Sequence, residues 1–197
     1  MKRIILFLFA LVFASPYLRA THNIAGEITV TCLGGLQYQV KISTYTNSLS
    51  AADRCDLTIF WGDNTSSTAP RINGGTSNCG PNEHDGDLLT AQGYPTTKEN
   101  FYVTTHNYPG PGTYTLFIKD PNRVQGINNI PNSVNQPFYL QTTIIIDPTI
   151  GCNSTPYLTA LPLDKACVGE CFYHNPGAVD PDGDSLSYSI GPCLDTL

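Results

Sequence analysis

Three carboxylates at alternate positions form the pattern in this sequence that is most typical of an ion site. They are Asp180, Asp182 and Asp184, in a stretch rich in turn residues. A hard cation such as Ca²⁺ takes about six to eight oxygen ligands, so converging carboxylates supply part of its shell. An EF-hand is not indicated, because Gly191 occupies the twelfth loop position. The sequence therefore predicts Ca²⁺ as cofactor, with further ligands from elsewhere; the alternative is a solvated turn whose aspartates cap the backbone.

Seven cysteines provide a second chemistry, which is disulfide formation in an oxidising compartment. An odd number leaves one cysteine unpaired, and the connectivity does not follow from sequence. We predict Cys55 with Cys79 and Cys167 with Cys193, because these pairs keep each bridge inside one domain. Cys167 and Cys171 have CxxxC spacing, but zinc is disfavoured since no second such pair follows. The seven are Cys32, Cys55, Cys79, Cys152, Cys167, Cys171 and Cys193.

Catalytic motifs are missing from the sequence, which has four histidines but no GxSxG turn, no HExxH and no phosphate-binding glycine loop. We therefore expect no enzyme activity. One alternative is a copper enzyme: cleavage after Thr21 would make His22 the first residue, able to chelate copper with a second histidine such as His106. Another is a carbohydrate-binding module attached to a secreted hydrolase. Its aromatic platform would consist of Trp61, Tyr94, Tyr102 and Tyr108.

The first twenty residues have the pattern of a secretory signal peptide. Lys2 and Arg3 precede an apolar run over residues 4–14, and cleavage is expected after Ala20. Leu18 is not the small residue preferred before a cut, so cleavage after Ala14 or Ser15 is the alternative. The run is too short to span a bilayer, and no other segment is apolar enough. The sequence thus predicts a secreted or cell-surface protein without a transmembrane segment.

Composition limits the class of protein and its partners. The 197 residues are 41% hydrophobic and 13% charged, which suits one domain and part of a second. After loss of Lys2, Arg3 and Arg19 with the leader, seven basic residues face sixteen acidic ones, a net charge of about −9. This charge argues against nucleic acid or an anionic membrane as partner.

Alternation of apolar and polar residues predicts an all-β fold. Residues 36–45 place Tyr38, Val40 and Ile42 on one face and Gln39 and Lys41 on the other, as in a half-buried antiparallel strand. The region 73–98 has little apolar periodicity and is predicted to be a long loop. Short strands and turns of this kind favour a sandwich of two antiparallel sheets. Further strands are expected at residues 24–32, 56–61, 101–105, 113–119 and 138–146.

Two motifs resemble the polycystic-kidney-disease (PKD) repeat. One is Phe60-Trp61-Gly62-Asp63-Asn64, and the other begins at His106 as HNYPGPGTYTL. The family has a WxFGDG-like turn and an HxYxxxGxYxVxL-like strand pair, and the resemblance implies an immunoglobulin-like sandwich. Asn64 replaces the family's glycine, and the insertion at 73–98 also departs from the pattern. Both departures concern turns and leave the fold expectation unchanged.

Residues 21–29 and 179–188 resemble exported surface proteins of gliding bacteria, which string PKD and cadherin-like modules ahead of a type IX sorting domain. The resemblance implies a non-catalytic scaffold or adhesion module of a longer protein, acting in gliding motility. We expect a PKD-like domain at 21–148, a linker at 149–155 and an incomplete cadherin-like or immunoglobulin-like β domain at 156–197. Expected partners are an extracellular glycan or protein ligand, or neighbouring modules of the parent chain.

Overall fold

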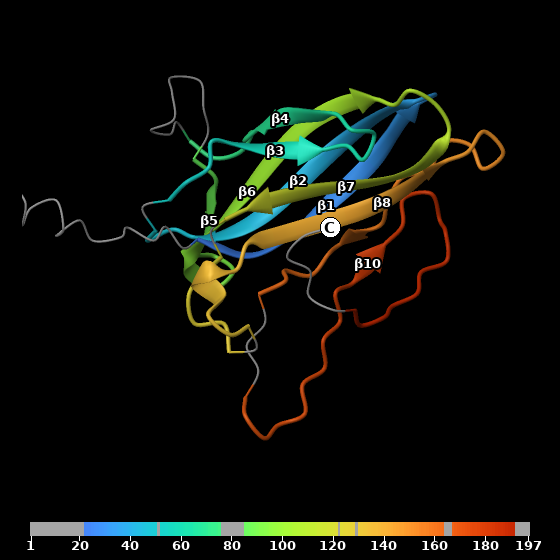
Figure 1. The fold of residues 1–197 in the computed structure, drawn as a ribbon. Helices are drawn as coiled ribbons and strands as arrows, with labels where there is room; N and C mark the ends of the chain where they lie inside the picture. The colour runs from blue at the N-terminus through green and yellow to red at the C-terminus, as the bar shows by residue number, and fades with distance from the viewer. Residues whose placement is uncertain are drawn as a thin grey trace, which may run out of the picture.

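Two four-stranded antiparallel sheets form the main body of the fold (Figure 1). The computed structural model describes residues 22–50, 52–75, 85–121, 123–128, 130–163 and 167–191. The first sheet has the order β1 (Asn23–Gly34), β2 (Gln37–Asn47), β6 (Tyr94–Asn107), β5 (Asp87–Leu89). The second has the order β4 (Ser66–Pro70), β3 (Asp56–Phe60), β7 (Gly112–Asp120), β8 (Phe138–Ile146). The predicted all-β, immunoglobulin-like sandwich is therefore confirmed.

The core lies between the two sheets and follows from the alternation in the strands. Val40 and Ile42 of β2 are fully buried, and so are Ile59 of β3 and Leu116 of β7. These residues belong to one hydrophobic cluster to which both sheets contribute. Successive side chains of a strand point to opposite faces, so every second residue of these strands enters the core. Burial of this apolar surface is the main stabilising contribution to the sandwich.

Every strand that alternation predicts is present, but the loop expected over residues 73–98 is wrong in part. Strand β5 and the beginning of β6 lie inside that region. A partly buried ionic network borders this region and includes Lys98 of β6. The Arg71 side chain is fully buried and donates to both carboxylate oxygens of Asp53, at 2.6 and 3.0 Å, and to Asn100 Oδ1 at 3.1 Å. Lys98 Nζ donates to Asp53 at 3.4 Å. The charged residues that interrupt the apolar periodicity here are therefore paired with one another.

Arg71 and Asp53 also affect each other's protonation. Burial by itself opposes ionisation of Asp53, but the hydrogen bond and charge of Arg71 outweigh it and hold the carboxyl pKa below its ordinary value. Asp53 therefore stays ionised at neutral pH. A buried ion pair of this kind stabilises the fold only while both partners are charged and hydrogen-bonded.

The C-terminal part has little regular structure of its own. A short antiparallel pair joins β9 (Tyr157–Leu158) to β10 (Ala178–Val179), and a 3-10 turn, η1 (Ser133–Asn135), precedes β8. In Figure 1 the orange and red chain runs beside the sandwich near β1 and β8.

Within the described ranges, no helix has the length and apolarity needed to cross a membrane.

Two neighbouring isoleucines of β8 test the orientation of this strand. Ile144 is 5% exposed and belongs to the core, whereas Ile145 is 56% exposed. Ile144→Ala is expected to lower the free energy of unfolding by roughly 2–5 kcal/mol, because it leaves a cavity. Ile145→Ala is expected to change it by less than about 1 kcal/mol. Urea denaturation of the two variants measures the difference, and equal losses would contradict the assigned register.

Candidate functional site

The two PKD-like motifs meet at one end of the sandwich and form a packed aromatic cluster. The Trp61 and His106 rings are stacked with centroids 4.5 Å apart, and Tyr108 packs edge-on against both. His106 Nε2 lies 2.8 Å from Asp63 Oδ2. Burial opposes ionisation of Asp63, but hydrogen bonds from Thr65 and His106 outweigh it and hold the carboxyl pKa below its ordinary value. These contacts give the motif residues a structural role.

The turn that contains Gly62 and Asn64 has a left-handed backbone conformation at both residues. Gly62 has a φ of 80°, and a Cβ at this position would lie 2.6 Å from the carbonyl oxygen of Thr115. Asn64, which replaces the family's glycine, has a φ of 68°. Asparagine tolerates this left-handed conformation better than most residues, so the departure from the motif leaves the turn intact.

Three of the four residues of the alternative aromatic platform for glycans are buried. Trp61, Tyr102 and Tyr108 are at most 3% exposed and belong to the core cluster. Tyr94 packs against a smaller cluster, and its hydroxyl donates to the carbonyl oxygen of Leu163. The rings of Trp61, Tyr102 and Tyr108 therefore lie in the core between the sheets, where they cannot stack on a sugar.

The two histidines of the copper hypothesis lie at opposite ends of the first sheet. Asn47 donates its backbone N–H to the carbonyl oxygen of His22 at 2.8 Å, whereas His106 pairs with Tyr38. Nine residues of β2 separate Tyr38 from Asn47, which is roughly 30 Å of strand. His22 and His106 therefore cannot chelate one copper ion. Burial also lowers the pKa of His22, which is 1% exposed.

Two of the three aspartates of the predicted calcium site accept hydrogen bonds from backbone N–H groups. Asp180 Oδ1 accepts the backbone N–H groups of Asp182 and Asp184, at 2.9 and 3.0 Å. Asp182 Oδ2 accepts the N–H of Ser154 at 2.6 Å. Among the described residues, no group of three His, Cys, Asp or Glu side chains is placed to hold a metal ion. Calcium binding by these three residues stays a prediction.

The cysteines show one bridge that sequence reasoning missed. Cys32 of β1 is bonded to Cys152, across 120 residues of chain. The rule that kept each bridge within one domain excluded this pair, because Cys152 falls in the predicted linker. Cys55 is disulfide-bonded, and its predicted partner Cys79 lies outside the described residues.

The second predicted bridge also stays a prediction. Cys167 and Cys171 are exposed free cysteines in the structure. Cys193, the predicted partner of Cys167, lies outside the described residues.

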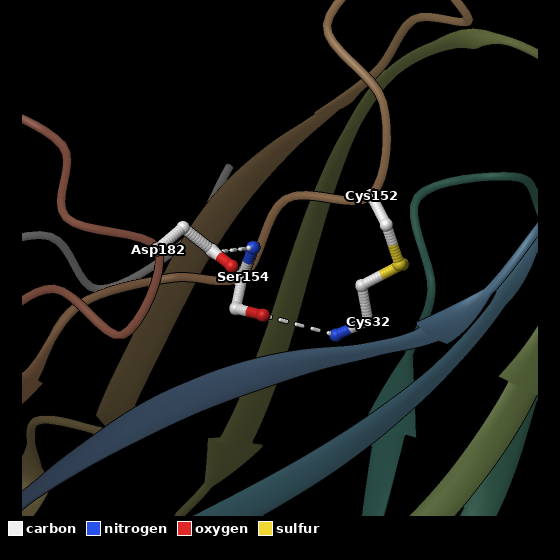
Figure 2. Close-up of a disulfide and its surroundings, with 4 residues drawn as sticks. All are labelled: Cys32, Cys152, Ser154 and Asp182. Carbon is white, nitrogen blue, oxygen red and sulfur yellow. Dashed lines mark hydrogen bonds between the residues drawn. A yellow bond between two sulfur atoms is a disulfide. The ribbon is translucent and has the colours of Figure 1, made fainter.

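The Cys32–Cys152 bridge fixes a segment that we call the strap, residues 152–163, along the free edge of β1. Figure 2 shows the bridge together with Ser154, whose Oγ accepts the Cys32 N–H at 3.2 Å. Val30 donates its N–H to Thr155 Oγ1 and accepts the Thr155 N–H, both at 2.8 Å. Residues 152–155 of the predicted linker are thus attached to the sheet.

The strap continues across the outer face of the first sheet. Leu158 donates its N–H to Glu27 Oε2 at 3.2 Å. At its far end, Leu163 is 7% exposed and packs in a cluster with Tyr45 and Leu89. The strap is therefore held at its start, in its middle and at its end.

Between the strap and the sheet lies a pocket of about 330 Å³. Its floor is the outward-facing side of three strands and its other wall is the strap. The pocket is the candidate functional site, because it combines acidic, basic, hydroxyl and aromatic side chains. The floor residues are Glu27, Thr29 and Thr31 of β1, Lys41, Ser43 and Tyr45 of β2, and Glu99 and Phe101 of β6. The strap contributes Thr155, Tyr157, Leu158, Thr159, Ala160 and Leu161, and Pro181 completes the lining.

The charged groups of the pocket have distinct environments. Burial raises the pKa of Glu27 above its ordinary value of 4.5, although the Leu158 N–H and the Lys41 charge act in the opposite direction. Tyr45 donates its hydroxyl to Glu99 Oε1 at 2.9 Å. Burial, with a further contribution from Glu99, raises the Tyr45 pKa. Lys41 Nζ lies 3.6 Å from the centroid of the Phe101 ring, as in a cation–π contact.

Sequence reasoning missed this pocket although its residues are visible in the alternation. Glu27, Lys41 and Glu99 occupy the polar face of their strands, which a single strand presents as a solvated surface. Nothing in the local pattern shows that the strap, which is distant in sequence from all three strands and bonded through Cys32–Cys152, lies across that face.

Comparisons with protein-family models, with curated proteins and with solved structures find no match to this chain.

The raised pKa of Glu27 predicts how stability depends on pH. Because the folded pKa exceeds the unfolded one, ionised Glu27 costs stability above its folded pKa, and the cost disappears as pH falls toward 4.5. Glu27→Gln removes this cost while its amide oxygen still accepts the Leu158 N–H. The stability of this variant relative to wild type is therefore expected to increase as pH rises from acidic to neutral.

Denaturation at several pH values measures this difference. Glu170→Gln, at an exposed glutamate outside the pocket, is the matched control and is expected to show a smaller change with pH. A Glu27→Gln variant that loses relative stability as pH rises would contradict the assignment.

Proposed function

We propose that the chain is a non-catalytic module of an exported bacterial protein, a PKD-type domain that acts as scaffold or adhesion module at the cell surface. The observation that carries the proposal is the cluster of motif residues. Trp61 stacks on His106, and His106 is hydrogen-bonded to Asp63, so the residues most suited to chemistry serve the fold.

The Cys32–Cys152 bridge supports an extracellular location. Disulfides persist in oxidising compartments, which agrees with the leader-like residues 1–20. The bridge closes a loop of 120 residues, and the chain-entropy model gives such a bridge about 5 kcal/mol of stabilisation. A scaffold outside the cell benefits from this cross-link, because no cellular machinery refolds it there.

Calcium binding by Asp180, Asp182 and Asp184 belongs to the proposal as a linkage between modules. It requires oxygen ligands from beyond the turn, as a following module would supply. The proposal also includes gliding motility and type IX secretion, and the support for these is the sequence resemblance of residues 21–29 and 179–188 alone.

Export of the full chain tests the proposal. The full chain is produced in bacteria together with its leader. We expect either that protease added to intact cells digests the chain at the cell surface, or that the chain is recovered from the medium. The recovered mature protein is expected to contain the Cys32–Cys152 bridge and to begin near residue 21 by mass spectrometry. Deletion of residues 4–14 removes the apolar run and is expected to retain the chain inside the cell.

A protease-resistant location inside intact cells, with Cys32 and Cys152 reduced, would contradict the proposal. A cytoplasmic protein with the same level of expression serves as the lysis control in this experiment.

A further inference from the structure

The pocket under the strap has the chemistry of a ligand site rather than of a gap in packing. Its volume of about 330 Å³ is at the lower end of the range of roughly 300–1,000 Å³ for small-molecule sites. A pocket of this size accommodates roughly one sugar ring. It is formed by two parts of the chain, the strands of the first sheet and the strap, which the Cys32–Cys152 bridge holds together.

The two glutamates of the pocket, Glu27 and Glu99, provide carboxylate acceptors that are only partly used. Glu27 uses one carboxylate oxygen for the Leu158 N–H, and Glu99 uses one for the Tyr45 hydroxyl. Within the described part of the chain, the second oxygen of each carboxylate accepts no hydrogen bond. A ligand that pairs with both carboxylates must supply several donors.

The net charge of the lining is negative, because Glu27 and Glu99 face a single basic residue, Lys41. The Thr29 hydroxyl donates to the carbonyl oxygen of Lys41 at 3.3 Å and can still accept, and the Ser43 hydroxyl can donate and accept, so both suit a ligand with several hydroxyls. Tyr157 and Leu161 give the strap wall apolar surface against which the C–H groups of a ring can pack.

We propose that this pocket binds a hexosamine unit, a sugar ring that carries hydroxyls and one protonated amine. The amine pairs with the free oxygens of Glu27 and Glu99, the hydroxyls bond to Thr29 and Ser43, and the ring packs beneath Tyr157. The inference rests on the proposed function, because it names the ligand class of the same exported module. The site differs from the Trp61 platform that the structure excludes.

Four small ligands separate the contributions of amine and hydroxyls. Glucosamine, glucose, N-acetylglucosamine and butylamine are titrated into the mature chain, with the disulfides intact, and followed by protein NMR. Glucosamine is expected to shift the Glu27 and Glu99 amides and to bind at least about tenfold more tightly than the other three, since each lacks the charged amine or the hydroxyls. No binding of glucosamine, or equal affinity for glucose, overturns the proposal.

Substitutions in the pocket test the assigned roles. Glu27→Gln and Glu99→Gln are each expected to weaken glucosamine binding by about tenfold, whereas Glu170→Gln is expected to leave it unchanged. Unchanged binding by both pocket variants would overturn the proposal. Thermal unfolding of each variant shows whether it is folded.

Lys41→Gln provides a test that structural damage cannot imitate. Removal of the one positive charge in the pocket is expected to tighten glucosamine binding by about twofold to fivefold at low salt. Weaker binding of glucosamine by a folded Lys41→Gln variant would overturn the proposal that the negative charge of the pocket attracts the amine. A chain that is exported but binds no glucosamine refutes this inference alone, whereas a chain that binds glucosamine but stays in the cytoplasm refutes the proposed function alone.

Discussion

The attachment of the strap to β1 is the interaction on which the rest of this structure depends. β1 is the outer strand of the first sheet, so its second edge presents backbone N–H and C=O groups that need partners. Thr155 provides two hydrogen bonds to Val30, and Cys152 adds the covalent bond to Cys32. An edge open to pairing with other chains is thereby covered by the protein's own chain, which is an advantage for a domain that works outside the cell.

Coverage of the edge also changes the outer face of the sheet. Glu27, Lys41 and Glu99 would be ordinary solvated residues on an open sheet. With the strap above them, Glu27 becomes partly buried, its pKa rises, and the acceptors of both carboxylates face a confined space. Edge protection and pocket formation are thus two results of one constraint, and the chemistry of the pocket depends on the disulfide at the start of the strap.

Alternation predicts the strands whose inner faces are apolar, as in 36–45 and 138–146, because local periodicity and burial agree there. It fails for β4, β5 and the beginning of β6. Close to these strands, Arg71, Asp53 and Asn100 pair with one another through polar groups, which local apolar periodicity does not reveal. It also fails for the pocket and for the Cys32–Cys152 bridge. Both depend on contacts between residues far apart in the sequence, which no local pattern contains.

Hydrogen exchange at the Thr155 amide tests the central claim most directly, because this N–H donates to the carbonyl oxygen of Val30. In the oxidised protein it is expected to exchange as slowly as the amides of the sheet strands. In the Cys32→Ser/Cys152→Ser variant, with the sandwich still folded, it is expected to exchange at least about 100-fold faster, because the strap is no longer held. Exchange of the Thr155 amide at the rate of an unstructured peptide in the oxidised protein would contradict the account.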